Sequence, residues 1–504
     1  MTTVPATPSF LATRRGKLTL ALLCTVAFLD LVDASIVNVA LPSMRHDLHF
    51  SVQSLQWVPS GYLLTYGGFM LLGGRVADLL GRRRVLVAGT TLFALASFAG
   101  GLANDAGVLI GARLVQGVGA AMMMPAALSI LTTSFAEGSD RNKALGAWGG
   151  TAGLASAFGV LLGGVLTEGP GWRWVLFVNP PVCLLVLGAT FCLLAGDRRE
   201  AAFADFDLRG ALLATGGMLL LVYALVKAPE VGWGATRTIA ELVGAFVVLG
   251  AFLLNEQRRK HPLLPLSTFR IRGLAAADAT QLIAVAGFIS MFFFLTLYMQ
   301  NVLGYSPIKT GLAYLPVCFG VAITAGISSQ LLARTGTRSL IAGGTLVAAA
   351  GVYLLSSIPV HGSYVSDVLP GMVVMSIGLG AAFVAVTTAA NAGVPEDKAG
   401  LAAALLNASQ QLGGALGLAI FSAVATSRTN DLLAAHTPLP DALDAGFQRA
   451  LLASSFFLVA AAVIALWTRN AHGEEDVAPP TDYGAAAETL EISALTARTT
   501  TSRR

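Results

Sequence analysis

Short segments that carry charged residues, proline or glycine divide the chain into long apolar runs. A helix needs about 20 predominantly apolar residues to cross a bilayer. Fourteen such runs can be counted, centred near residues 30, 64, 94, 119, 155, 185, 218, 246, 287, 322, 348, 378, 412 and 457. The runs near 218 and 246 have the least sharply defined boundaries. The pattern predicts an all-α membrane protein with fourteen transmembrane spans, which places both termini on the same side.

Loops rich in lysine and arginine alternate along the chain with loops poor in them, as expected when the cytoplasmic loops of a membrane protein carry the excess of positive charge. With fourteen spans, 24 of the 32 basic residues fall on the side of the termini and 7 on the other side, while Arg113 lies within a run. We therefore expect a multi-pass protein of the cytoplasmic (inner) membrane with both termini in the cytoplasm.

The composition excludes several classes of protein. Hydrophobic residues make up 55% of the 504 positions, charged residues make up 12%, and the mean hydropathy is +0.71, values that belong to a protein in lipid. The net charge of +4 is spread over short loops, which argues against nucleic-acid binding. The four cysteines lie within apolar runs without the spacing of a metal site. No nucleotide-binding loop or catalytic constellation is apparent, so we expect neither an enzyme nor a cofactor.

A faint repeat connects the two halves of the chain. Residues 74–84 read GRVADLLGRRR and residues 329–338 read SQLLARTGTR, with Gly81 and Gly336 in matching places. Duplicated halves are a common way to build a transporter. We predict a cytoplasmic tail (1–17), a six-helix bundle (18–195), two inserted helices (196–256), a second six-helix bundle (257–468) and a disordered cytoplasmic tail (469–504).

Three ionisable residues deep within the runs are the strongest candidates for function, because charges in a bilayer are costly. Asp30 and Asp33 lie three residues apart in the first run, where desolvation and mutual repulsion favour a neutral carboxyl. We expect at least one of them to bind and release a proton near neutral pH. Arg113 is expected at a similar depth to Asp33, so we predict an ion pair. The pair either only fixes helix packing or, as we predict, loosens when Asp33 is protonated.

Two glycine-containing segments are candidates for moving parts. In the tight turn at 74–84, Asp78 and Arg82 are four residues apart, a spacing that permits an ion pair if the helix continues. In the fifth run, the pairs Gly146/Gly150 and Gly159/Gly163 have the small-xxx-small spacing that lets membrane helices pack closely.

Aromatic and amide residues in other runs are candidates for the wall of a substrate cavity, with structural packing as the alternative for each. They are Trp57, Tyr62, Gln116, Gln281, Phe292, Tyr298, Asn407, Gln410 and Gln411. Glu241 and Asp278 are expected in the first turns of their helices, where an acid suits the helix dipole, and are assigned no role.

Several of these segments resemble the fourteen-helix drug:proton antiporter family of the major facilitator superfamily. Residues 33–42 (DASIVNVALP) are similar to its first-helix signature, residues 74–84 to its cytoplasmic loop motif, and residues 113–119 (RLVQGVG) to the motif whose arginine is associated with proton coupling. Residues 172–180, 300–307 and 407–414 also resemble family segments.

The resemblance implies the major facilitator fold, with two six-helix bundles and two extra central helices. It implies a cytoplasmic gate at Gly74, Asp78, Gly81 and Arg82, proton coupling at Arg113, and a fifth-helix motif at Gly159, Gly163 and Gly164. The family usually has a proline directly after the first of these glycines, where this chain has Val160. The missing proline puts the kink of that helix in question.

Proton-driven efflux of small amphipathic drugs or antibiotics is therefore the predicted function, with protons as the coupling ion, the lipid bilayer as surroundings and a monomer as the working unit. One alternative is a dedicated exporter of a single metabolite or self-made antibiotic. Another is a membrane sensor that keeps the fold and transports nothing.

Overall fold

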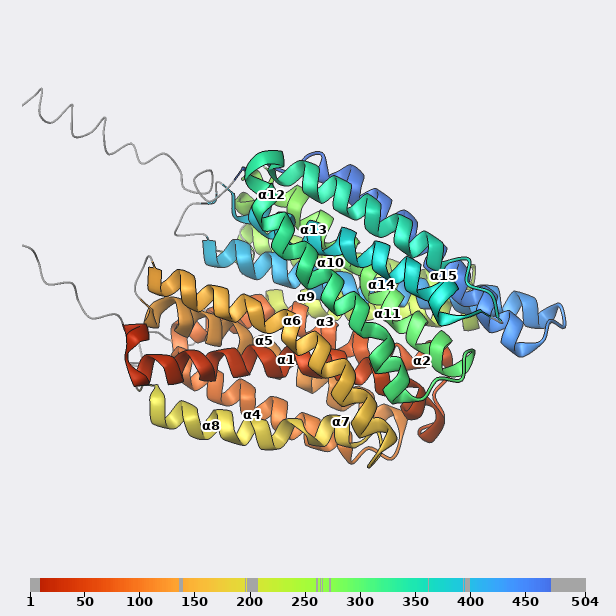
Figure 1. Cartoon of the computed structure of the whole chain (residues 1–504), viewed down its shortest axis with the longest axis horizontal. Helices are drawn as coiled ribbons and strands as arrows, with labels where there is room; N and C mark the ends of the chain where they lie inside the picture. The colour runs from red at the N-terminus through yellow and green to blue at the C-terminus, as the bar shows by residue number, and fades with distance from the viewer. Residues whose placement is uncertain are drawn as a thin grey trace, which may run out of the picture.

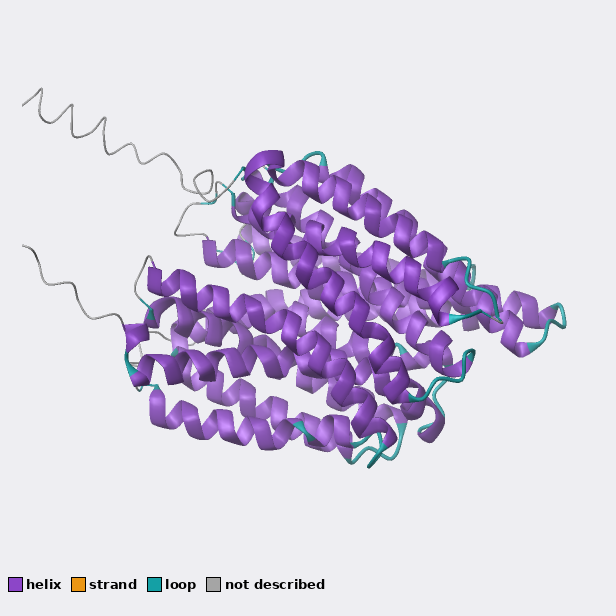
Figure 2. Ribbon diagram, viewed as in Figure 1, coloured by secondary structure: helices purple, strands orange, loops and turns teal. Residues whose placement is uncertain are grey.

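The computed structural model describes residues 10–135, 139–194, 196, 207–259, 262, 264, 266–271, 273–360, 362–392, 394 and 399–472. Within these residues the regular structure is entirely helical (Figure 2), so the predicted all-α class is confirmed.

The helices follow the predicted apolar runs. Their bounds are α1 (Arg14–Asp47), α2 (Val52–Leu55), α3 (Trp57–Leu80), α4 (Arg82–Gly101), α5 (Ala106–Ser134), α6 (Ser139–Glu168), α7 (Trp174–Phe177), α8 (Asn179–Leu193), α9 (Leu208–Val231), α10 (Thr236–Arg258), α11 (Leu274–Asn301), α12 (Pro307–Leu355), α13 (Leu369–Asn391), α14 (Ala399–Ala434) and α15 (Leu439–Ala465). Short 3₁₀ or π segments lie at Phe10–Ala12, Leu266–Arg270 and Tyr364–Val368.

Twelve helical segments of the described chain are long and apolar enough to cross a membrane. The 24-residue α3 is not among the twelve, and α12 is counted once although it has 49 residues. At 1.5 Å per residue α12 would measure about 73 Å, more than twice the thickness of the hydrocarbon core. The count of fourteen spans stays a prediction.

Glycines with positive φ interrupt the helices at the two matching positions of the sequence repeat. Gly81 (φ 104°) separates α3 from α4, and Gly336 (φ 74°) breaks α12 into residues 307–335 and 337–355. A Cβ at residue 336 would lie 2.3 Å from the Oδ1 atom of Asn470. Both places need glycine for its backbone freedom, and Gly336 also needs it for the lack of a side chain.

Two groups of helices lie side by side (Figure 1). Helices α1, α4, α5, α6 and α8 lie in the lower half of the view, and α12 to α15 in the upper half, with both ends of the described chain at the left. Helix α3 packs on α5 and belongs to the first group, and α11 packs on α14 and α15 and belongs to the second. The two groups meet where α1 contacts α11, α6 contacts α12 and α3 contacts α14.

Helices α9 and α10 pack against each other, and α9 also packs on α3 and α14. At the start of α9, Asp207 accepts hydrogen bonds from Gly210 N (2.9 Å) and Asn255 Nδ2 (2.7 Å), which ties the beginning of α9 to the end of α10. A Cβ on Gly68 of α3 would lie 2.4 Å from the Oγ1 of Thr215, so α9 approaches α3 closely. Helix α9 therefore covers the junction between α3 and α14, with α10 packed on α9. The predicted domain boundaries stay a prediction.

Candidate functional site

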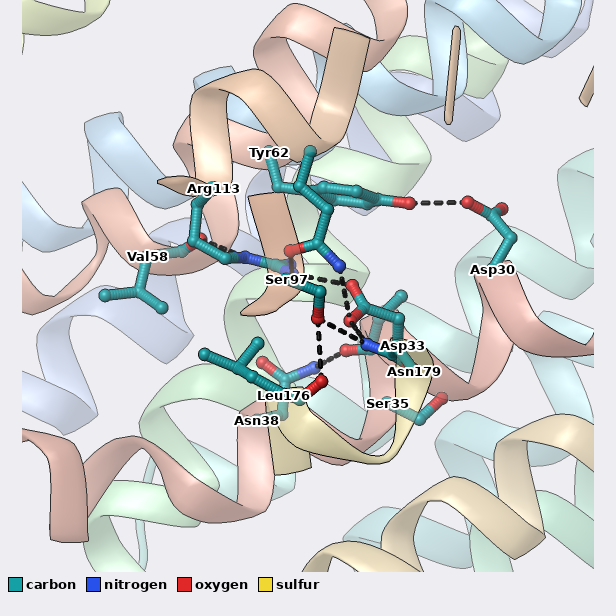
Figure 3. A network of polar contacts seen from close by, with 12 residues as sticks. Asp30, Asp33, Ser35, Asn38, Val58, Tyr62, Ser97, Arg113, Leu176 and Asn179 are labelled. Carbon is teal, nitrogen blue, oxygen red and sulfur yellow. Dashed lines mark hydrogen bonds and ion pairs between the residues drawn. The ribbon is translucent and has the colours of Figure 1, made fainter. Parts of the chain in front are cut away.

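A buried polar network joins four helices within the first group (Figure 3). Helix α1 supplies Asp33, α5 supplies Arg113 and Gln116, α4 supplies Ser97, and α8 supplies Asn179 at its first position. Helices α1, α4 and α5 are apolar over most of their length, so these buried polar side chains find hydrogen-bond partners in one another and in nearby backbone carbonyls.

Asp33 and Arg113 form the ion pair at the centre of the network. The Nη1 of Arg113 lies 2.6 Å from the Oδ2 of Asp33, and the two residues are 1% and 0% exposed. A pair so short, with both charges removed from water, interacts much more strongly than a surface pair. The predicted contact between these two residues is present.

The second carboxylate oxygen of Asp33 accepts two amide hydrogen bonds. Gln116 Nε2 donates to Oδ1 at 2.8 Å, and Asn179 Nδ2 donates to the same atom at 2.7 Å. Asn179 also donates to the Oγ of Ser97 at 3.0 Å, and Ser97 in turn donates to the carbonyl of Leu176 at 2.8 Å. Both carboxylate oxygens of Asp33 therefore accept hydrogen bonds, which come from Arg113, Gln116 and Asn179.

Arg113 has partners on three further sides. Its Nη1 donates to Gln116 Oε1 at 2.8 Å, and its Nε donates to the carbonyl of Val58 at 3.2 Å. Its guanidinium carbon lies 4.3 Å from the centre of the Tyr62 ring, in a cation–π contact. Arg113 therefore keeps neutral contacts that remain when the charge of Asp33 is removed.

Asp30 lies one turn before Asp33 on α1 and has hydrogen-bond partners of its own. The hydroxyl of Tyr62 donates to Asp30 Oδ1, and the hydroxyl of Tyr66 donates to Oδ2 at 3.2 Å. The ring of Tyr62 lies against Arg113 while its hydroxyl donates to Asp30 (Figure 3), so this tyrosine contacts both Asp30 and the ion-pair partner of Asp33.

The network can respond chemically to a single proton. A proton on Asp33 removes the negative charge that balances Arg113 and turns one acceptor oxygen into a hydroxyl. A buried arginine without a counter-charge is unfavourable.

The residues predicted as a gate lie where α3 ends and α4 begins. The helix does not continue through this segment, because it ends at Leu80 and Gly81 has φ 104°. The side chain of Asp78 lies outside the described part of the structure, so its ion pair with Arg82 stays a prediction. A Cβ on Gly74 would meet only Pro125, at an ordinary 3.6 Å.

The glycines of α6 separate into two sets. Added Cβ atoms would lie 2.7 Å from Ser35 Cβ at Gly159, 2.8 Å from Ile36 O at Gly163 and 2.7 Å from Ile308 Cα at Gly164. Glycine is required at these three positions, which bring α6 against α1 and α12. The expected close packing at the Gly146/Gly150 pair is wrong, since nothing lies within 4 Å of an added Cβ at either position.

The predicted cavity residues occupy several different surroundings. Tyr62 and Gln116 belong to the network above, and Gln281 Nε2 donates to Gln410 Oε1 at 3.1 Å. Phe292 packs against Phe288 and Tyr314, and the hydroxyl of Tyr298 donates to the carbonyl of Pro359. Asn407 donates to the carbonyl of Ala403 in its own helix. Trp57 is half-buried against the core, and Gln411 lies against Gly67.

Sequence reasoning missed Tyr66, Ser97 and Asn179 as network residues. Asn179 stands before Pro180 at the start of α8, and its role depends on how α8 packs against α1, which hydropathy does not encode.

The expected first-turn placement of Glu241 and Asp278 is wrong. Neither the first turn of α10 nor that of α11 contains an acidic residue. Glu241 pairs with Arg237 one turn earlier, at 2.9 Å, whereas Asp278 is buried.

Comparison with known proteins places this chain among transporters. The model of the Major Facilitator Superfamily matches residues 23–418. The puromycin resistance protein pur8 of Streptomyces alboniger is 42% identical over 84% of each chain. The cephamycin export protein CmcT of Amycolatopsis lactamdurans is 39% identical over 88% of this chain and 91% of its own.

Solved structures with low sequence identity share the fold. A bacterial homolog of the human lysosomal transporter Spinster, in an inward-facing and unoccupied conformation, has a TM-score of 0.64 at 16% identity, covering 90% of this chain and 97% of its own. The POT family transporter PepTSo has a TM-score of 0.66 at 15% identity, with the same coverage.

Proposed function

The chain belongs to the Major Facilitator Superfamily, and from its buried site we propose that it exports small amphipathic antibiotics or drugs across the cytoplasmic membrane in exchange for protons. The observation that carries the proposal is the fully buried Asp33–Arg113 ion pair, whose carboxylate is the simplest proton-binding group in the network. Charged groups inside a membrane protein commonly form proton and substrate pathways.

In the proposed cycle, a proton from outside binds Asp33 and weakens its ion pair with Arg113. Arg113 then relies on Gln116, the Val58 carbonyl and the Tyr62 ring, and the helices that carry these groups change their packing. Release of the proton to the cytoplasm restores the pair. Both termini lie in the cytoplasm in this proposal, and the monomer is the working unit.

The relatives support the substrate class. The matching proteins from Streptomyces and Amycolatopsis are named for resistance to puromycin and export of cephamycin. Asp30 is available to balance a cationic group on such a substrate, since its partners are the neutral hydroxyls of Tyr62 and Tyr66.

A narrower function is dedicated export of one antibiotic, and relatives whose names specify a single compound favour it. One of them is the tetracenomycin C resistance and export protein of Streptomyces glaucescens, which is 34% identical over 84% of this chain and 77% of its own. A panel of compounds separates the two: a multidrug exporter moves several unrelated ones, and a dedicated exporter moves one.

The test uses purified protein in liposomes that are more acidic inside than outside. Adding puromycin outside should cause protons to leave, followed with a trapped pH-sensitive dye, while puromycin accumulates inside. A protonophore should abolish the accumulation, and liposomes without protein provide the baseline. Puromycin accumulation that stays the same when a protonophore is added would contradict proton antiport. A membrane sensor would move none of puromycin, cephamycin and a panel of lipophilic cations.

A further inference from the structure

Asp278 on α11 is a buried carboxyl group that the proposed cycle does not use. The residue is 5% exposed, and neither of its carboxylate oxygens has a hydrogen-bond partner. It lies about 6 Å along α11 from Leu274, beyond the first turn that would stabilise an acid through the helix dipole.

The surroundings of Asp278 are apolar. Leu274 and Ala277 of α11 belong to a buried cluster that also contains Ala402 and Leu406 of α14. Residues 369–391 of α13 and 399–427 of α14, the helices beside this part of α11, contain no Asp, Glu, Lys or Arg.

The charged groups described on the other neighbouring helices form no hydrogen bond or ion pair with Asp278. Helix α15 carries Asp441, Asp444 and Arg449 near its start, at the opposite end from Asp278. Beyond its end, Arg469 lies beside Gly273, and Arg338 of α12 donates to the carbonyl of Thr468 at 2.9 Å. On α1, Asp30 and Asp33 have the partners described above. None of these groups offers Asp278 a hydrogen bond or an ion pair.

An ionised carboxylate in this position would be strongly unfavourable, because no donor or positive charge in the described part of the structure compensates for the loss of water. The arrangement therefore fits the protonated form of Asp278. A leucine or an asparagine would fill similar space at lower cost, so an aspartate here indicates use of its proton.

A discontinuous line of polar side chains lies between Asp278 and Asp30, and Asp278 itself is hydrogen-bonded to none of them. Gln281 follows one turn after Asp278 on the same face of α11 and donates to Gln410 of α14. The next residue, Gln411, lies against Gly67 and within hydrogen-bonding reach of Tyr66. Tyr66 in turn donates to Asp30 at 3.2 Å.

This line crosses from the second group of helices to the first. It runs along the contact between α14 and α3, where the two groups meet. Asp278 lies near the start of α11, beside the C-terminal end of the described chain, whereas Asp30 lies in the middle of α1. Asp278 is therefore closer than Asp30 to the end of the bundle that carries the termini.

We propose that Asp278 is a second proton-binding site, which takes up and releases a proton during transport from its place in the second group of helices. The proposal rests on the proton-coupled function above. Binding forms an O–H bond on one carboxylate oxygen and changes the charge of the side chain from minus one to zero. The bound species is a proton, and Asp278 carries it on the cytoplasmic side of the Asp30 centre.

Infrared difference spectroscopy of the purified full-length protein tests proton binding without any substrate. Changing the pH across the neutral range should reveal the C=O band of a buried carboxylic acid that is lost in Asp278→Asn. The band should return at a shifted position in Asp278→Glu, which keeps a carboxyl group. Asp441→Asn, at an exposed aspartate of α15, is the matched control and should leave the band unchanged.

A transport measurement tests whether the proton is used. With puromycin as the probe in liposomes, the number of protons moved per puromycin should fall by one in Asp278→Asn and stay at the wild-type value in Asp441→Asn. An unchanged spectrum or an unchanged proton count in Asp278→Asn would overturn the proposal. If the wild type moves no protons with any compound, the proposed antiport fails, while the infrared band still decides whether Asp278 binds a proton.

Discussion

At the scale of single residues, the site balances one buried negative charge against one buried positive charge. Asp33 accepts hydrogen bonds from Arg113, Gln116 and Asn179. Arg113 also contacts the neutral Gln116 amide, the Val58 carbonyl and the Tyr62 ring. Removing either charge therefore changes a network of several hydrogen bonds and not a single contact.

Breaking the ion pair from one side should destabilise the protein. Arg113→Gln leaves the Asp33 carboxylate buried without its counter-charge, at a cost of about 3–5 kcal/mol. The double variant Asp33→Asn/Arg113→Gln should regain most of that stability, because no buried charge remains. Thermal unfolding in detergent measures both.

The exposed pair between Arg173 and Asp47 provides the control, with side chains 36% and 46% exposed. Arg173→Gln should cost about 1 kcal/mol or less. Equal losses of stability for the double variant and for Arg113→Gln would show that the charge balance is not what matters at this site.

Residue depth was enough to predict the contact between Asp33 and Arg113, because two opposite charges at one level of a membrane protein have few other partners. Depth did not predict the contributions of Asn179 or Tyr66, which depend on the side of each helix that faces the network. Asp278 was misjudged because helix α11 begins earlier, at Leu274, than the first-turn interpretation requires.

At the scale of elements, α6 is tightly packed along one half and open along the other. Gly163 and Gly164 allow backbone contact with α1 and α12, while Gly146, Gly149 and Gly150 have nothing within 4 Å of an added Cβ. On the other side of the contact, a Cβ on Gly311 of α12 would lie 2.4 Å from the carbonyl of Val160. Val160, where the related family usually has proline, thus lies at the contact between the two groups of helices.

A side chain at residue 164 should force α6 and α12 apart. We expect Gly164→Val to increase the labelling of a cysteine placed at Ile308 by a water-soluble maleimide, in a background without the four native cysteines, because the added Cβ would overlap the backbone of residues 307 and 308. Gly150→Val, on the same helix, should leave the labelling unchanged. Similar labelling in both variants would mean that the glycine contact does not hold the helices together.

The glycine spacing in the sequence predicted close packing for both pairs on α6 and was right for only one. Spacing identifies a face of small residues, but whether another helix lies on that face depends on the arrangement of the whole bundle.

At the scale of the whole molecule, the two groups of helices meet along α1/α11, α6/α12 and α3/α14, and α9 covers the last of these junctions. Any exchange of access between the two sides of the membrane requires these contacts to change. The Asp33 network lies within the first group, whereas the polar residues between Asp30 and Asp278 lie on helices of both groups, so in the proposed cycle proton binding would affect the contact between the groups.

Hydropathy predicted the all-α membrane fold, and the faint repeat identified Gly81 and Gly336 as equivalent breaks between helices. The number of spans is harder to predict, because α12 runs through Gly336 almost without a loop and α3 has glycine and polar residues among its apolar ones. The packing of α9 against both α3 and α14 is a long-range contact that no local pattern contains.

The most direct test of the account compares two modes of puromycin transport in liposomes containing Asp33→Asn. Exchange of internal for external puromycin needs no net proton movement, whereas accumulation against a puromycin gradient requires proton coupling. The account predicts that Asp33→Asn keeps exchange and loses accumulation driven by a pH gradient, to the level seen with a protonophore. Full accumulation in Asp33→Asn would contradict proton coupling at Asp33 and leave the buried pair with a purely structural role.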